Sequence, residues 1–310
     1  MTRVQPRTPK RSAFTLIELM IVILILVILV SLLAGAVLKV MARVPEVKTR
    51  TEITELQTAL QAFMNDYQLS EPPPSYLVLY ENVSLYPTST VTGALQSYQF
   101  LTKVFGKNLG NTDWNGDGVI DGPGGAANPW VLSGEYCLVF YLGGIPSNPN
   151  NVLSPGVLPA GLGFSTNNMK PSYGSMAGET MGKRRGPYYS FETTRLYPQP
   201  AANPAPGGFY VYLDPWNSKT GQNYTAIGGC PYAYFSSRGI SNSYTATSIY
   251  GALPYAYGSG QYYNPNGYQI ISAGKDGNFG NGNMTTGIAI GAGADDQANF
   301  SSTLLGLGQN

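Results

Sequence analysis

Two hydrophobic patterns follow one another along the first part of the chain. Residues 14–38 form an almost unbroken apolar run, in which only Ser31 is polar between Leu19 and Leu38. About 20 apolar residues span roughly 30 Å as a helix, which is enough to cross the hydrocarbon core of a bilayer. The run therefore predicts a membrane-spanning helix.

The second pattern, over residues 46–67, is amphipathic. Its apolar residues recur at spacings of three and four, the period of one helix face, and they are Ile53, Leu56, Leu60, Phe63 and Tyr67. Charged and amide side chains occupy the other faces. The two patterns together predict one long helix within residues 14–69, ended by Pro72–Pro74. We expect its first half in a membrane or filament core and its second half packed on a β-sheet.

The rest of the chain divides into a loop-rich part, residues 70–208, and a β-rich part, residues 209–310. In the first part the sequence predicts a loop-rich insertion or subdomain, with short strands at Tyr76–Leu79 and Tyr136–Leu142 and a short helix at Gln96–Phe105. In the second part, aromatic and β-branched residues between turn signals predict three strands, which are Phe209–Leu213, Tyr232–Ser236 and Tyr268–Ser272. The expected fold class is α+β, with a small antiparallel sheet.

The charge and the residue composition of the chain exclude several classes of function. The chain has 310 residues with a net charge of +1, so no global positive field points to nucleic acid. It contains no histidine, which excludes histidine-based triads, general bases and metal ligands. Basic residues are concentrated before the apolar run, whereas the first acid is Glu18. By the positive-inside rule, residues 1–13 stay in the cytoplasm and the bulk of the chain lies on the other side of the membrane.

Glu18 is a carboxylate at the start of an apolar segment, where a charge is costly in lipid and therefore suggests a function. It belongs to the junction Ala13-Phe-Thr-Leu-Ile-Glu18, which directly follows the basic segment. This junction resembles the N-terminus of type IV pilins and type II secretion pseudopilins, except that the family usually has glycine at the position of Ala13. The resemblance implies that prepilin peptidase cleaves between Ala13 and Phe14, that the new amino group of Phe14 is methylated, and that Glu18 directs filament assembly.

Two simpler interpretations of the N-terminus compete with this resemblance. In the first, the apolar run is a plain signal anchor and Glu18 has no role. In the second, Ala34-Gly-Ala36 is the A-x-A cleavage site of a secretory signal peptide, and a soluble protein without Glu18 is released. Two observations argue against the signal-peptide interpretation: the apolar run is long for a signal peptide, and helical patterning continues beyond it.

The segment between Asp113 and Asp121, with the sequence DWNGDGVID, predicts a calcium loop. Oxygen-bearing side chains alternate along it, a glycine follows for the turn, and a main-chain carbonyl is offered before the last acid, as in the first part of an EF-hand loop. The expected ligands are Asp113, Asn115, Asp117, Val119 and Asp121. The closing glutamate of an EF-hand is missing, since Gly124 stands in its place. A solvated turn is the alternative interpretation.

Three phrases in the last hundred residues resemble the C-terminal half of the major pseudopilin of type II secretion, the general secretion protein G type. They are Leu213–Trp216 (LDPW), Pro231–Phe235 (PYAYF) and Gly267–Gly277 (GYQIISAGKDG). The resemblance implies an antiparallel sheet closed against the long helix and a second calcium loop, with Asp276, Asp295 and Asp296 as ligands. Residues 72–208 lie outside the resemblance, as do the extra residues between Trp216 and Pro231. Whether the subunit is a major or a minor component therefore stays open.

Cys137 and Cys230 are the two cysteines. In an exported protein they could form a disulfide; alternatively, both are buried free thiols. Their spacing in the sequence does not decide between these two possibilities.

The preferred function is a structural, non-enzymatic subunit of a type II secretion-like pseudopilus. The implied partners are copies of the same chain in a filament, minor pseudopilins, prepilin peptidase and the assembly platform of the inner membrane. The C-terminal domain is expected in the periplasm or outside the cell. A surface pilin for adhesion or motility is the close alternative, and a secreted or anchored enzyme is the alternative from another class.

Overall fold

The computed structural model describes residues 14–116, 119–122, 125, 127–145, 163–167, 171–172, 183–198, 209–216, 229–246 and 248–307. It divides into two compact units, Met1–Pro45 and Glu46–Asn310. The predicted α+β class is confirmed, because one long N-terminal helix is followed by small antiparallel sheets.

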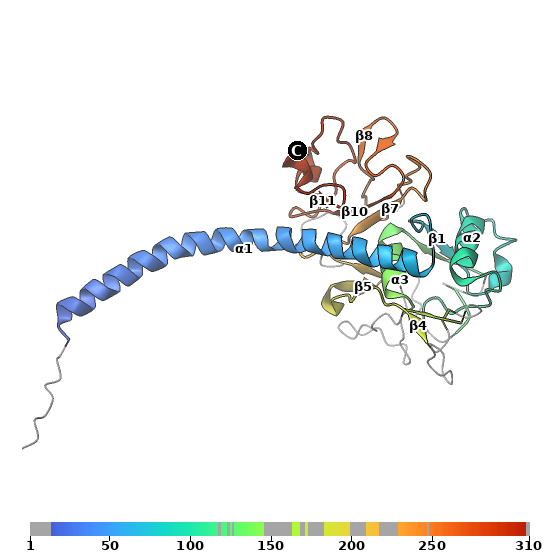
Figure 1. Cartoon of the computed structure of the whole chain (residues 1–310), viewed down its shortest axis with the longest axis horizontal. Helices are drawn as coiled ribbons and strands as arrows, with labels where there is room; N and C mark the ends of the chain where they lie inside the picture. Colours follow the sequence, from blue (N-terminus) through green and yellow to red (C-terminus); the bar gives the residue numbers. More distant parts are fainter. Residues whose placement is uncertain are drawn as a thin grey trace, which may run out of the picture. The chain divides into compact units, whose positions relative to one another are not determined.

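Helix α1 runs from Leu16 to Asp66 without a break (Figure 1). It begins close to the predicted start and continues through Pro45. In the first unit its apolar side chains are exposed, and its most apolar window has a mean hydropathy of 3.3 with none of it buried. Within the described residues it is the one helix long and apolar enough to cross a membrane.

The second unit contains the remaining elements. Its two further α-helices in the described part are α2 (Ala94–Phe105) and α3 (Gly134–Gly143). The strands are β1 (Leu77–Leu79), β2 (Trp130–Leu132), β3 (Phe164–Ser165), β4 (Arg184–Arg185), β5 (Leu196–Pro198), β6 (Tyr210–Tyr212), β7 (Ala233–Ser236), β8 (Ala256–Gly258), β9 (Gln261–Tyr262), β10 (Tyr268–Ser272) and β11 (Gln297–Ala298). Short 3-10 turns are η1 (Val83–Leu85), η2 (Thr193–Arg195), η3 (Gly291–Ala294) and η4 (Leu305–Leu307).

The sheets of the second unit are small and antiparallel. The largest described sheet has the strand order β11-β10-β7, and the others are the pairs β1-β2, β3-β4, β5-β6 and β8-β9. In the largest sheet, Ile270 of β10 faces Tyr234 of β7, and Ile271 of β10 faces Ala298 of β11. The predicted strand Tyr268–Ser272 agrees with β10 to the residue, and β1, β6 and β7 fall inside predicted strands.

The predicted strand Tyr136–Leu142 is wrong, because these residues lie in α3. The run is apolar throughout, so it shows neither the alternation of a half-buried strand nor the stripe of a half-buried helix. Every residue of α3 is buried, which explains the absence of periodicity. The helix begins after Ser133 and ends at Gly144, whose φ of 78° terminates it and whose N–H donates to the Phe140 carbonyl at 2.9 Å.

The apolar stripe of the second half of α1 packs into the main core. Leu56 and Leu60 are fully buried there. The ring of Phe63 lies 5.4 Å from that of Tyr141 on α3 and 5.5 Å from that of Tyr188, edge to face with the latter. Helix α1 therefore packs in part against α3, in place of the strand expected from the sequence.

Candidate functional site

The N-terminus of α1 carries the predicted assembly residues. Glu18 Oε2 accepts hydrogen bonds from the N–H and the hydroxyl of Thr15, both at 2.9 Å, while the Glu18 N–H donates to Thr15 Oγ1 at 3.3 Å. This reciprocal pair is a capping box, which satisfies main-chain donors that the first helical turn leaves without partners. Glu18 thus has a local role within its own helix.

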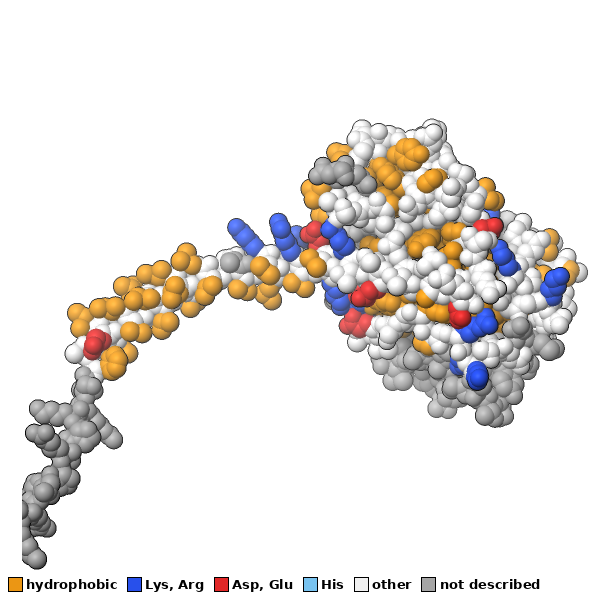
Figure 2. Space-filling view, viewed as in Figure 1, with side chains coloured by type: hydrophobic (Ala, Val, Ile, Leu, Met, Phe, Trp, Pro, Cys, Tyr) orange, Lys and Arg blue, Asp and Glu red, His pale blue; other side chains and the backbone are white. Residues whose placement is uncertain are grey.

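The surroundings of Glu18 are apolar and exposed. Phe14 is 80% exposed, and the large apolar side chains from Leu16 to Val30 are each exposed by nearly half or more. Figure 2 shows these side chains gathered around the first part of α1. Such a surface is unfavourable in water and is typical of a segment that lies in lipid or against other apolar helices. The other predicted cleavage residue, Ala13, lies outside the described residues.

The predicted calcium loop between Asp113 and Asp121 is folded into the protein. Asp113 and Asn115 are fully buried, and Asp113 Oδ1 accepts a hydrogen bond from the Gly116 N–H at 2.7 Å. Val119 is half exposed. Asp117 lies outside the described residues.

Glu81 is a member of this loop that sequence reasoning missed. It follows β1, is 1% exposed, and reaches across to the loop through both carboxylate oxygens. Oε1 accepts from the Trp114 N–H at 3.2 Å and Oε2 from the Asp121 N–H at 2.6 Å. The sequence places Glu81 far upstream of the loop, and no local spacing signal connects the two. Glu81 therefore adds a buried carboxylate to the loop that contains Asp113, Asn115 and Asp121.

The second predicted calcium loop brings its three aspartates into electrostatic contact. Asp295 Oδ2 accepts from the Asp276 N–H at 2.8 Å. Burial raises the pKa of Asp276, and the neighbouring Asp295 carboxylate raises it further. Burial also raises the pKa of Asp296 well above its usual range, and the two other aspartates add to this effect. The carboxylates of Asp276 and Asp296 are therefore costly to hold in their charged form without a cation.

One carboxylate oxygen of Asp296 is buried without a hydrogen-bond partner among the described residues. Oδ2 accepts from the Tyr255 hydroxyl at 2.6 Å and from the Gly280 N–H at 3.0 Å. Oδ1 is buried and has no hydrogen-bond partner in the described part of the chain. A buried carboxylate oxygen is costly unless a proton or a cation satisfies it, and hard oxygen donors suit calcium.

The donor chemistry of both loops thus fits a hard cation. Among the residues that the structure describes, however, no three histidine, cysteine, aspartate or glutamate side chains are arranged as a metal-binding group. Asp117 lies outside the described residues, and calcium also takes main-chain carbonyl and amide oxygens as ligands.

The two cysteines are buried thiols of the main core. Cys137 Sγ lies 3.6 Å from the Leu132 carbonyl oxygen, and Cys230 Sγ lies 3.9 Å from that of Pro231. Burial raises the pKa of Cys137 well above its usual range, which suppresses the reactive thiolate.

The three C-terminal phrases LDPW, PYAYF and GYQIISAGKDG lie side by side. Leu213 forms an antiparallel bridge with Pro231, and β7 pairs with β10. Asp214 Oδ2 accepts a hydrogen bond from the Ser272 hydroxyl at 2.6 Å, which joins the first phrase to the third.

The comparison with family models adds one finding. Residues 8–34 match the prokaryotic N-terminal methylation motif, the prepilin-type signal of type IV pilins and pseudopilins. The motif indicates the pilin-like class, whose members are processed by prepilin peptidase and serve as structural proteins. The apolar helix fits the membrane anchor of such a protein. No curated protein and no solved structure matches the chain.

Proposed function

We propose that this chain is a filament subunit of the pseudopilin type in a type II secretion-like system. Prepilin peptidase removes residues 1–13, the amino group of Phe14 is methylated, and the subunit enters a filament through the first half of α1. The matched methylation motif supports the processing step.

The observation that carries the assembly role is the position of Glu18. Its carboxylate stands among exposed apolar side chains, so packing of these helices against one another would remove it from water. An unpaired charge in that environment is expensive, whereas a carboxylate paired with a cation is tolerated. In the proposed filament, the cation is the N-terminal amine of Phe14 on a neighbouring subunit. The pairing fixes the axial position of one helix against the next, because electrostatic complementarity selects geometry.

The second unit supports a secretion system over a surface pilus. The three phrases that resemble the major pseudopilin in sequence are adjacent in space, joined by the β7–β10 pairing and the Asp214–Ser272 hydrogen bond. The proposed partners are therefore further copies of the chain, minor pseudopilins and the inner-membrane assembly platform, with the second unit on the periplasmic or extracellular side. Surface fibres that contain the chain would favour the pilin alternative instead.

Mass spectrometry of the mature N-terminus tests the processing step directly. The protein is expressed with and without prepilin peptidase, and its N-terminal peptide is sequenced. We expect a methylated Phe14 only when the peptidase is present. A terminus at Val37 would indicate a signal peptide, and an intact residue 1 in the presence of active peptidase would indicate a plain signal anchor.

We also propose that calcium occupies one or both acidic loops of the second unit. Two observations support it: the buried Oδ1 of Asp296 has no hydrogen-bond partner among the described residues, and the Glu81 carboxylate accepts hydrogen bonds from the Trp114 and Asp121 N–H groups of the first loop. The C-terminal loop would use Asp276, Asp295 and Asp296. The cation would neutralise carboxylates that otherwise repel one another, and so would order each loop that it occupies.

A further inference from the structure

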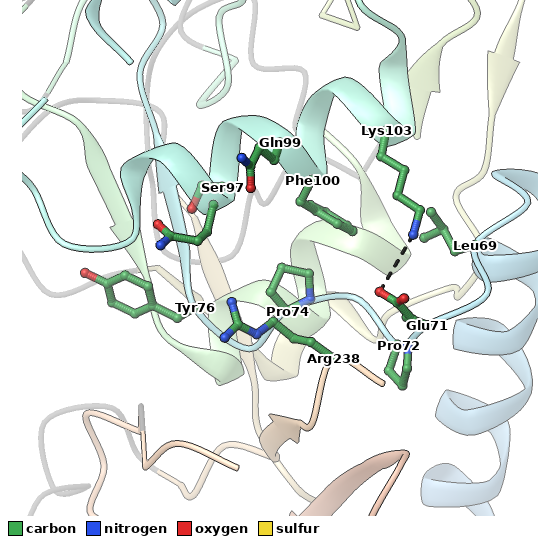
Figure 3. A pocket seen from close by; sticks show the side chains of 11 residues that line it. Leu69, Glu71, Pro72, Pro74, Tyr76, Ser97, Gln99, Phe100, Lys103 and Arg238 are labelled. Atoms are coloured by element: carbon green, nitrogen blue, oxygen red, sulfur yellow. Dashed lines mark ion pairs between the residues drawn. The ribbon is translucent and has the colours of Figure 1, made fainter. Parts of the chain in front are cut away.

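A groove lies in the second unit between α2 and the segment that follows α1. It consists of two adjoining cavities of about 210 and 450 Å³, which share Pro74, Tyr76, Gln96 and Arg238. Figure 3 shows Tyr76 toward one end, the Lys103–Glu71 ion pair toward the other, and the Arg238 side chain between them. Cavities of a few hundred Å³ are of the size that small ligands occupy.

The proline segment of the groove is held rigidly by the core beneath it. The carbonyl oxygens of Pro72, Pro73 and Pro74 accept hydrogen bonds from Ser236 Oγ at 3.4 Å, Tyr234 at 2.7 Å and Tyr141 at 2.8 Å, respectively. Proline also fixes its own φ, so this wall has little conformational entropy left to lose. A rigid wall of this kind favours binding, because a ligand need not order it.

The charges along the groove do not balance. Glu71 and Lys103 neutralise each other at 3.7 Å. Arg238 is exposed, and no carboxylate of the described residues pairs with its guanidinium. Its main chain is fixed by a hydrogen bond from its N–H to Ser236 Oγ at 3.0 Å, and the next residue, Gly239, packs directly against Glu71. The groove therefore presents one positive charge, on an anchored main-chain position, that no carboxylate of the described residues compensates.

The remaining lining combines aromatic rings with amide groups. Tyr76 and Phe100 are partly buried, and the Phe100 ring is held 5.7 Å from that of Tyr141. Gln96 and Gln99 are exposed on α2, and their amides form no hydrogen bonds within the described structure. An amide both donates and accepts hydrogen bonds, as the hydroxyl groups of a sugar do.

We propose that this groove binds an acidic saccharide. Its carboxylate would pair with the Arg238 guanidinium, a geometry that arginine favours. The apolar face of a sugar ring would lie on Tyr76 or Phe100, and its hydroxyls would meet Gln96 and Gln99. An extended peptide is a poorer fit, since peptides add to open strand edges and the carbonyls of this proline segment are already used. The proposal is independent of the filament function.

The test measures binding of trigalacturonate to the full chain in detergent micelles by saturation-transfer NMR and calorimetry. The methyl ester of the same trisaccharide is the neutral probe, and a triglutamate peptide is the acidic non-saccharide probe. We expect trigalacturonate to bind at least about ten times more tightly than either. Equal binding of the methyl ester would refute the role of the charge, and equal binding of the peptide would refute the saccharide.

Three variants locate the site. Arg238→Gln should weaken trigalacturonate binding about ten-fold or more, and Tyr76→Leu should weaken both saccharides. Lys107→Gln removes an exposed positive charge outside the groove and should leave binding unchanged. Thermal unfolding of each variant shows that the fold is intact. Wild-type affinity in Arg238→Gln, or equal losses in Arg238→Gln and Lys107→Gln, would overturn the proposal.

Discussion

Glu52 of α1 and Arg195 at the end of η2 form an ion pair across 143 residues of sequence, with Arg195 Nη1 donating to Glu52 Oε2 at 2.9 Å. Arg195 Nη2 also donates to Glu52 Oε1, which makes the pair bidentate. The Tyr232 hydroxyl donates to the same carboxylate at 2.8 Å. The side chains of Glu52 and Arg195 are only 7% and 14% exposed, so solvent screens the pair weakly. It joins the second half of α1 to two later parts of the second unit.

We expect Glu52→Ala to lower the free energy of unfolding of the second unit by about 3–5 kcal/mol, because it removes the buried, bidentate partner of Arg195 and leaves only the half-exposed Glu192 beside its charge. The measurement is urea unfolding of the full chain in detergent micelles, followed by tyrosine and tryptophan fluorescence. Glu192→Ala is the matched control. Glu192 also pairs with Arg195, at 2.9 Å, but is 50% exposed, and its loss should cost about 1 kcal/mol or less. Equal losses in the two variants would contradict a special role for the buried pair.

Asp214 should make stability depend on pH. Burial raises its pKa from 3.8 to about 7 in the folded protein. Between these values the folded chain holds a proton that the unfolded chain releases. Its contribution to stability is therefore complete below about pH 4 and is lost as the pH rises toward 7, at up to about 1.4 kcal/mol per pH unit.

The variant Asp214→Asn isolates this effect, because its amide imitates the neutral acid at every pH. Urea unfolding at pH values from 4 to 8 should show that stability falls more steeply with pH in the wild type than in the variant. Burial also raises the pKa of Glu135 and Asp296, and these groups contribute to the pH dependence of both proteins. The difference between the stability curves of the wild type and the variant therefore isolates Asp214. Parallel curves would mean that Asp214 is ionised in the folded protein throughout this range.

The sequence predicted those elements whose signal is local. Helix α1 was predicted because a long apolar run is followed by apolar residues at a helical period, and β10 because aromatic and β-branched residues stand between turns. Helix α3 was mistaken for a strand because it is buried on all sides, so its sequence carries no period that distinguishes the two. Its identity depends on tertiary packing, which a pattern read along the chain does not contain.

In the candidate sites too, local contacts could be predicted from the sequence and long-range contacts could not. Thr15 and Glu18 stand at the spacing of a capping box, so that contact could have been read from the sequence. The contact of Glu81 with the loop of Asp113 could not be predicted from the sequence. It depends on how the segment after β1 folds against a loop more than thirty residues later. The adjacency of Asp214 and Ser272 is likewise a product of the sheet.

Calcium should stabilise the second unit. Thermal unfolding of the full chain in detergent micelles should shift to higher temperature as calcium is added, and chelator should reverse the shift. At a concentration one hundred times the dissociation constant, binding to the folded state alone contributes about 2.7 kcal/mol. We expect the C-terminal loop to contribute more, because Asp296 is packed beside β11 in the largest sheet.

Three conservative variants assign the calcium effect. Asp276→Asn should reduce the shift through the C-terminal loop, and Glu81→Gln should reduce it through the loop of Asp113. Glu55→Gln, an exposed acid on α1, is the control and should behave as the wild type. If calcium does not change the unfolding temperature of the wild-type protein, both proposed sites are wrong.

The last prediction separates the two roles of Glu18. Its carboxylate caps its own helix through Thr15, and in the proposed filament it also pairs with the amine of Phe14 on a neighbour. Glu18→Gln keeps an acceptor for the capping box but removes the charge. Glu18→Ala removes both. If the charge directs assembly, the two variants should be incorporated into filaments equally poorly, while both are still cleaved and inserted into the membrane.

Filaments sheared from cells that co-express wild-type and variant subunits give the measurement, with the subunit ratio in the filament compared with that in the membrane. Thr15→Ala is the matched control, since it weakens the capping box and leaves the carboxylate in place. It should be incorporated nearly as well as the wild type, because a lost cap costs only about 1 kcal/mol. If Glu18→Gln assembles normally while Glu18→Ala and Thr15→Ala do not, the cap rather than the charge is what assembly requires, and the proposed pairing with Phe14 is wrong.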